Sequence, residues 1–110
     1  MFYIPSVIKQ FESRNGKYFW LNNTNLQILN ETDGKLIKSI EIESDKFLFD
    51  SQNNIVLINK KTKEINYFND LGILQDMMAI DNYRDGLDLI ISKDDELILF
   101  DKTSKKILLI

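Results

Sequence analysis

The chain contains no cysteine and no histidine, and it has only one proline and two arginines among its 110 residues. Without cysteine there can be no disulfide, no thiol nucleophile and no thiolate metal site. Without histidine, the commonest general base and the commonest metal ligand are missing. The serines have no Gly-x-Ser-x-Gly setting, and no glycine-rich phosphate loop is present. These absences remove the familiar catalytic arrangements, and we predict that the chain is not an enzyme.

Long apolar runs are missing as well. No run approaches the roughly 20 residues that a membrane-spanning helix needs. The N-terminus lacks the basic start and apolar core of a signal peptide. Hydrophobic residues at 44% and charged residues at 28% are ordinary for a soluble globular protein. We therefore predict a single cytoplasmic domain, residues 1–110, with no membrane partner.

The hydrophobic pattern repeats every second residue almost everywhere, which indicates strands rather than helices. Asn15-Gly16 is a strong signal for a two-residue hairpin, because both residues tolerate a positive φ. Short polar turns separate the other runs. The run Ile55–Ile58 is apolar at every position, which predicts a strand covered on both faces. The predicted fold class is all-β, an antiparallel meander of about ten strands.

One motif occurs three times: an apolar strand, an Asn or Asp, a polar turn and a second strand. Such self-similarity is typical of repeat architectures. The residues that begin the turns are Asn30, Asn59 and Asp101, and their side chains can accept hydrogen bonds from backbone N–H groups across the turn. The motif divides the chain into repeats at about 17–43, 46–68 and 87–110, with an irregular insert at 69–86.

The insert at 69–86 breaks the rhythm of the strands. Ile73, Met77 and Ile80 are spaced to line one side of a short helix. The same stretch could instead form a strand over 73–80, and we favour a strand or an irregular crossing. Because it is the part that does not repeat, the insert is where we expect function.

The turn pattern resembles the blade repeats of β-propellers, in which an Asp or Asn after a strand precedes a turn into the next strand. Here the pattern occupies residues 30–35, 59–64 and 101–106, and the resemblance covers about 17–110. It implies a truncated propeller-like arrangement or a curled meander. The chain departs from the family in lacking Gly-His and Trp-Asp signatures, and three repeats fall short of the roughly four to eight blades of a closed propeller. An ordinary antiparallel sandwich or half-barrel is the alternative.

The net charge is −3, but the charge is unevenly distributed. Residues 70–101 hold nine acidic groups against Arg84 and Lys93, a balance of −7. Such a block repels phosphate backbones, so we predict no nucleic-acid partner. It attracts basic surfaces, so we predict a basic protein partner.

Two acidic stretches invite a metal interpretation, because hard cations prefer oxygen ligands. Residues 94–96 put three carboxylates together, and residues 81–88 have a faint calcium-loop look. If a calcium loop is taken to begin at Asp81, Tyr83 stands where an Asp or Asn belongs. Ser92, which lies beyond this stretch, stands where the bidentate Glu belongs. Solvated turns explain both stretches, and we predict no metal and no cofactor.

Tyr83 and Arg84 lie in the acidic insert, and Tyr and Arg are residues that interfaces favour as anchors. Together with nearby carboxylates, they form the predicted partner-binding site. Its members are Asp76, Asp81, Tyr83, Arg84, Asp85, Asp88, Asp94 and Asp95.

In size, acidity, composition and lack of catalytic residues, the chain resembles small bacterial immunity proteins. That resemblance implies a non-catalytic module that neutralises a cognate toxin, such as a nuclease, by covering its active or substrate-binding surface. Nuclease toxins tend to be basic, and an acidic inhibitor associates with a basic partner quickly. Immunity families share no motif, so no residue is assigned from one. The alternative is a structural or interaction fragment of a larger β-propeller scaffold.

Overall fold

The computed structural model describes residues 7–109, which form strands joined by short turns and loops. These residues contain no helix, which confirms the all-β class, and hence none that could cross a membrane. The predicted last strand reached Ile110, which lies outside the described residues. The strands are β1 (Gln10–Arg14), β2 (Lys17–Leu21), β3 (Asn25–Asn30), β4 (Leu36–Glu41), β5 (Phe47–Phe49), β6 (Ile55–Asn59), β7 (Glu64–Phe68), β8 (Leu74–Ala79), β9 (Leu87–Ile91), β10 (Leu97–Asp101) and β11 (Lys106–Leu109).

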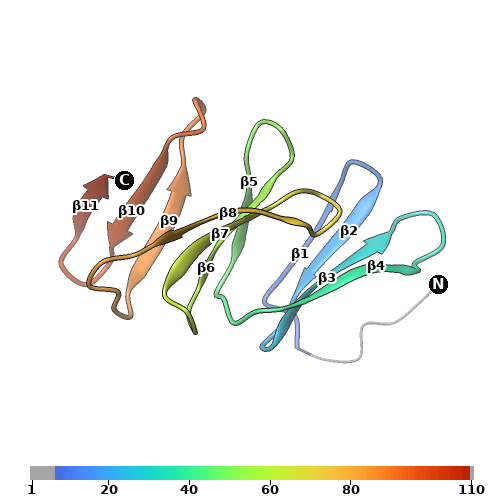
Figure 1. The fold of residues 1–110 in the computed structure, drawn as a ribbon, viewed down its shortest axis with the longest axis horizontal. Coiled ribbons are helices and arrows are strands. Elements are labelled where there is room, and N and C mark those ends of the chain that lie inside the picture. Colours follow the sequence, from blue (N-terminus) through green and yellow to red (C-terminus); the bar gives the residue numbers. More distant parts are fainter. Residues whose placement is uncertain (1–6, 110) are drawn as a thin grey trace.

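The strands form three antiparallel sheets, and each sheet is built from consecutive strands. Sheet 1 has the order β1-β2-β3-β4, sheet 2 the order β5-β6-β7-β8, and sheet 3 the order β9-β10-β11. Figure 1 shows the sheets side by side in a row, with sheet 2 in the middle. This meander confirms the predicted topology. A propeller-like relation between the sheets stays a prediction.

Asn, Asp and Gly residues shape the turns as their chemistry predicts. In the first hairpin, Asn15 and Gly16 have φ values of 53° and 76°, the left-handed values that a two-residue turn of this type requires. Oδ1 of Asn30, Asn59 and Asp101 accepts from the backbone N–H two residues further on, at 2.8, 3.1 and 2.9 Å. The turn role assigned to these three residues is therefore confirmed.

The three motif copies, however, occupy different strand positions. The Asn30 turn joins the third and fourth strands of sheet 1, whereas the Asn59 and Asp101 turns join the second and third strands of sheets 2 and 3. This offset explains why the first two copies are closer in sequence than the last two. It also shows where the insert belongs: it forms a strand, β8, which completes sheet 2, and a loop that leads to β9.

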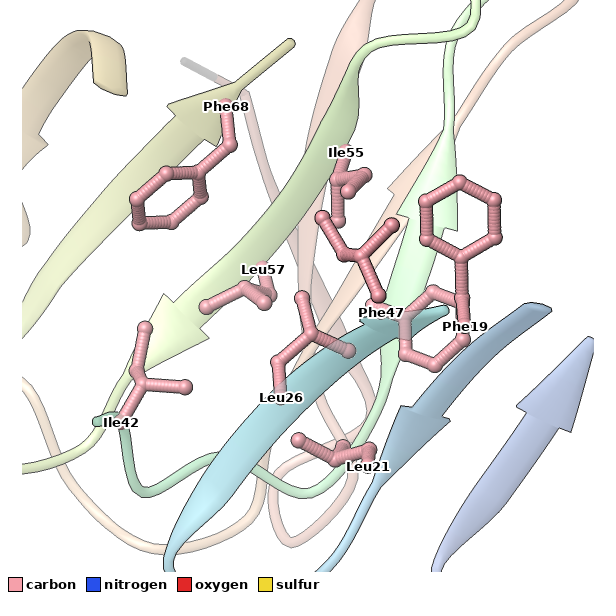
Figure 2. Packing of buried hydrophobic residues seen from close by; sticks show 9 residues of the cluster. Phe19, Leu21, Leu26, Ile42, Phe47, Ile55, Leu57 and Phe68 are labelled. Carbon is pink, nitrogen blue, oxygen red and sulfur yellow. The ribbon is translucent and has the colours of Figure 1, made fainter. Parts of the chain in front are cut away.

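The first hydrophobic core lies between sheets 1 and 2. Phe19 and Leu26 of sheet 1 pack in one cluster with Phe47, Ile55 and Leu57 of sheet 2, and none of the five is more than 1% exposed. Figure 2 shows these side chains pointing toward one another from the two sheets. Full burial of side chains this large contributes about 1.5–3 kcal/mol each, so this cluster fixes the two sheets together.

The second core lies between sheets 2 and 3, and it uses the other face of β6. Val56 and Ile58 cluster with Leu89 of β9 and Leu99 of β10. Successive side chains of a strand point to opposite faces, so β6 contributes alternately to the two cores. The prediction that Ile55–Ile58 is covered on both faces is therefore confirmed.

Two leucines of sheet 2 test this division between buried and open strands. Replacing Leu57, which is 1% exposed, by Ala should lower the free energy of unfolding by about 2–5 kcal/mol, because it leaves a cavity in the first core. Replacing Leu74 of β8, which is 44% exposed, by Ala should change the free energy of unfolding by less than about 1 kcal/mol. Urea titrations of both variants check the difference, and equal losses would contradict the burial described.

Candidate partner-binding surface

The strand β8 is exposed along its whole length, although it is rich in apolar residues. Leu74, Met77 and Met78 are 44%, 54% and 38% exposed. Leu71 and Ile73, in the turn before the strand, are also exposed. We call these five residues the β8 surface. Large exposed apolar side chains gathered along one segment often mark interaction sites in soluble proteins.

Both faces of β8 carry apolar side chains. Met77 lies opposite Asn66 of β7, and Met78 lies opposite Ile65, so the two methionines point to opposite faces of sheet 2. Within residues 7–109, neither hydrophobic core includes a side chain from β8. Sheets 1 and 3 therefore cover β6 but leave β8 open.

The free edge of β8 is partly closed by a carboxylate of its own. Among the described strands β8 pairs only with β7, so alternate backbone groups face away from the sheet. Oδ1 of Asp76 accepts from the Met77 N–H at 2.8 Å. A charged group on an edge strand discourages pairing with another sheet edge. We therefore expect a partner to contact the side chains of β8 rather than to extend the sheet.

The loop that follows β8 is held in place by Arg84. Its Nη2 lies 2.7 Å from Oδ2 of Asp101, and its Nε donates to the same oxygen at 2.9 Å. Its Nη1 donates to the Asn82 carbonyl oxygen at 3.0 Å. The Asp101 side chain is only 3% exposed, and the guanidinium of Arg84 lowers the pKa of Asp101 to about 2. Arg84 thus fixes the loop, and its guanidinium is already bound within the protein.

A glycine brings the end of this loop close to the β10–β11 turn. The Gly86 carbonyl oxygen accepts from the Lys102 N–H at 2.9 Å. Gly86 has a φ of 97°, and a Cβ there would lie 2.7 Å from Oγ1 of Thr103. Any larger residue would push the loop and the turn apart. The loop is therefore tied to sheet 3 by both its side chains and its backbone.

Tyr83 lines a pocket between sheets 2 and 3. The pocket has a volume of about 230 Å³, and its apolar lining includes Leu48, Val56 and Leu89. The side chain of Tyr83 packs against the second core, and this burial raises the pKa of its hydroxyl. Tyr83, one of the two predicted anchor residues, therefore also packs against the second core.

Two lysine–carboxylate pairs belong to the lining of this pocket. Nζ of Lys46 lies 2.8 Å from Oδ1 of Asp88, and Nζ of Lys60 lies 3.2 Å from Oδ1 of Asp45. The Ser44 hydroxyl, which also lines the pocket, donates to the Lys46 carbonyl oxygen at 3.0 Å. Asp88, a predicted binding residue, therefore already has a positive partner within the protein, Lys46, which immediately precedes β5.

Asp94 and Asp95 lie at the opposite end of sheet 3, in the turn between β9 and β10. Asp95 accepts hydrogen bonds from the Ser51 hydroxyl and from the Ser51 N–H, the latter at 2.9 Å, and both lower the pKa of Asp95. These bonds link the β9–β10 turn to the β5–β6 turn. The length of β9 separates Asp94 and Asp95 from the loop at 80–86, so these two residues do not join the others.

The predicted residues thus serve different purposes. Asp76, Asp81 and Asp85 remain exposed carboxylates, on β8 and in the loop that follows it, and within residues 7–109 they form no ion pair. The β8 surface itself was not predicted as a site. Its large apolar residues lie on either side of Gln75 and Asp76, and such a pattern does not show whether a strand packs against another sheet or stays exposed.

The described residues include no group of three or more acidic side chains placed to hold a metal ion. No protein-family model matches the sequence, and no curated protein matches it.

Replacing Asp101 by Asn tests whether the Arg84 ion pair holds the loop. The amide keeps an oxygen for the turn but loses the charge that faces the guanidinium, so we expect the thermal midpoint at pH 7 to fall by about 5 °C. The pKa of Asp101 lies near 2, below its ordinary value of 3.8. Its contribution is therefore complete above about pH 4 and is lost as the pH falls toward 2. The difference between wild type and variant, followed by circular dichroism, should shrink over that range.

Asn30→Asp is the matched control, because Asn30 accepts the same turn hydrogen bond at 2.8 Å. This variant should shift the midpoint by less than about 2 °C at pH 7. If Asp101→Asn melts like the wild type at pH 7, Arg84 does not anchor the loop.

Proposed function

We propose that the chain is a non-catalytic protein-binding module, an immunity protein that neutralises a cognate bacterial toxin by covering its active or substrate-binding surface. The observation that carries the proposal is β8, a strand whose six residues are all exposed and half of which are large and apolar. An edge strand left open to water in this way is costly unless a partner covers it. Its position in the non-repeating insert supports a role beyond the scaffold.

The apolar side chains supply the contact energy in this proposal. Methionine is unbranched and polarisable, so Met77 and Met78 can adapt to the shape of a partner. Leu74 and Ile73 lie beside them on the same strand and in its turn. A few such side chains near the centre of an interface carry most of the binding energy. We assign that role to Met77, the most exposed apolar residue of β8.

The carboxylates supply the choice of partner. Asp76, Asp81 and Asp85 lie on β8 and in the loop after it, and all three are exposed. Charges of one sign around an apolar centre attract a partner of the opposite sign and speed its association. A toxin domain that acts on nucleic acid needs a basic surface for its substrate, and an acidic inhibitor can occupy that same surface.

The fixed loop makes binding less costly. Arg84, Asp101 and Gly86 hold residues 80–86 against sheet 3 in the free protein. A partner that uses Asp81 and Asp85 therefore does not have to order the loop, and less entropy is lost on binding. Arg84 contributes by positioning the loop rather than as an anchor of its own.

Substitution at the apolar centre tests the proposal directly. The partner to be tested is the product of the adjacent gene, and calorimetry measures its affinity for this chain. Met77→Glu should weaken binding by about 30-fold or more, because a charge would be buried in the interface. Leu36→Glu is the control, because Leu36 of β4 is, like Met77, an exposed apolar residue on an edge strand, at 56% exposure. Leu36→Glu should bind like the wild type, and equal loss in both variants would contradict the proposed site.

Charge reversal tests the choice of partner. Replacing Asp76, Asp81 and Asp85 together by Lys should slow association by about tenfold at low salt and reduce its salt dependence. Asp33→Lys, in the exposed β3–β4 turn, is the single-site control for added positive charge. Asp88 is left unchanged because it pairs with Lys46. Unchanged association rates in the triple variant would rule out electrostatic recognition at this surface.

A further inference from the structure

Sheet 3 ends the row of sheets with a largely apolar face that no other sheet of the described residues covers, although Ile98 and Phe100 on it are partly buried. Leu97 and Leu99 of β10 point into the second core. Because side chains alternate along a strand, Ile98 and Phe100 point to the opposite face. Figure 1 shows sheet 2 on one side of sheet 3 and no other sheet on the opposite side. This outer face is largely apolar, although Asp88 of β9, which pairs with Lys46, lies opposite Phe100 on it.

The pairing register extends the outer face over all three strands. Ile98 lies opposite Ile90 of β9, and Phe100 lies opposite Ile107 of β11. Residues directly opposite in an antiparallel pair share a face. Ile90 is 44% exposed and Ile107 is 66% exposed. We call these four residues the sheet 3 outer face.

The same positions are covered in the neighbouring sheet. Ile98 and Phe100 occupy the places in β10 that Val56 and Ile58 occupy in β6, counted from the Asp101 and Asn59 turns. Val56 and Ile58 are buried against sheet 3. The chain thus makes the same kind of face twice and covers it once.

We propose that the sheet 3 outer face binds a second copy of this chain, in a two-fold dimer whose facing β10 strands run antiparallel. The two copies then bury the same four apolar residues against each other, which is the self-complementary contact that a two-fold interface requires. The surface is separate from β8, so this proposal stands or falls independently of the proposed toxin partner.

The charges at the two ends of sheet 3 fit this arrangement. The β9–β10 turn contains Lys93, Asp94, Asp95 and Glu96, a balance of −2, and these four residues are exposed. The β10–β11 turn and the start of β11 contribute exposed lysines. They are Lys102, Lys105 and Lys106. When two β10 strands face each other in antiparallel fashion, the acidic end of each copy lies over the basic end of the other.

The β8 surface fits self-association less well. Its neighbours Asp76, Asp81 and Asp85 carry the same sign, so two copies meeting there would repel each other. Asp76 also caps the edge of the strand through the Met77 N–H. Charge therefore directs the two apolar surfaces to different occupants: a basic protein at β8 and a second copy at sheet 3.

The size of the face sets the expected strength. Three strands of about five residues cover about 17 by 14 Å, and the buried area then falls below the roughly 1,200 Å² of a stable interface. A weak dimer with a dissociation constant of about 10–100 µM is therefore expected. Sedimentation velocity between about 5 and 500 µM should show a reversible shift from monomer to dimer, and a monomer throughout this range would overturn the proposal.

Substitution locates the contact. Ile107→Glu should raise the dissociation constant at least tenfold, and the exposure of Ile107 makes the change compatible with folding. Met77→Glu, on the β8 surface, should dimerise like the wild type. If Met77→Glu abolishes the dimer and Ile107→Glu does not, the copies associate through β8 and the proposal is wrong.

Charge exchange tests the antiparallel arrangement. A variant with Lys105→Glu and Lys106→Glu has two acidic ends, and a variant with Asp94→Lys and Glu96→Lys has two basic ends. Each alone should dimerise at least about tenfold more weakly than the wild type at low salt, because like charges meet. Mixed together, the two variants should form a heterodimer at least as readily as the wild type forms its homodimer. Failure of the mixture to associate, with both variants folded by circular dichroism, would overturn the antiparallel arrangement.

Discussion

The burial of sheet 2 on both faces is the constraint on which the rest of the structure depends. Alternate residues of β6 belong to two different cores, Ile55 and Leu57 to one, Val56 and Ile58 to the other. Each outer sheet buries its inner face only because sheet 2 offers it an apolar surface. A single strand with four consecutive apolar residues therefore joins three meanders, and substitutions at adjacent positions of it affect different interfaces.

This arrangement also determines which surfaces are left open. A row of sheets, unlike a closed ring, has end faces. In addition, the last strand of sheet 2, β8, extends beyond the two hydrophobic cores of the described residues. Sheet 3 presents the end face with Ile98 and Phe100, and sheet 2 presents β8. Both are apolar because their sequences follow the same rules as the buried strands. Their exposure follows from their position in the row.

The sequence predicts local structure well because its causes are local. The φ values of Asn15 and Gly16 and the side-chain caps of Asn30, Asn59 and Asp101 depend on a few neighbouring residues, and all agree with the prediction. The position of each motif copy within its sheet depends on long-range pairing. The motif alone does not show that the first copy lies one strand later in its sheet than the other two copies lie in theirs.

The candidate site was less predictable for the same reason. The ion pair between Arg84 and Asp101 joins residues that are far apart in sequence, and nothing in either local sequence indicates it. Likewise, β8 carries large apolar residues among polar ones, and only the packing of whole sheets decides that they stay exposed. The insert contains a strand, one of the two alternatives that its sequence favours, but the sequence does not mark its apolar residues as an exposed surface.

The acidic residues at 70–101 differ in whether the protein itself supplies a positive partner for them. Asp70, Asp88 and Asp101 are paired with Lys17, Lys46 and Arg84, so they stabilise contacts within the protein. The remaining carboxylates separate into two groups. Those beside β8 are uniformly negative, which favours a partner of opposite charge. Those at the β9–β10 turn lie at one end of β10, and a cluster of lysines lies at its other end. In two antiparallel copies, each acidic end can pair with the basic end of the other copy. A dimer through sheet 3 would therefore leave β8 open on each copy, and one assembly could bind two basic partners at once.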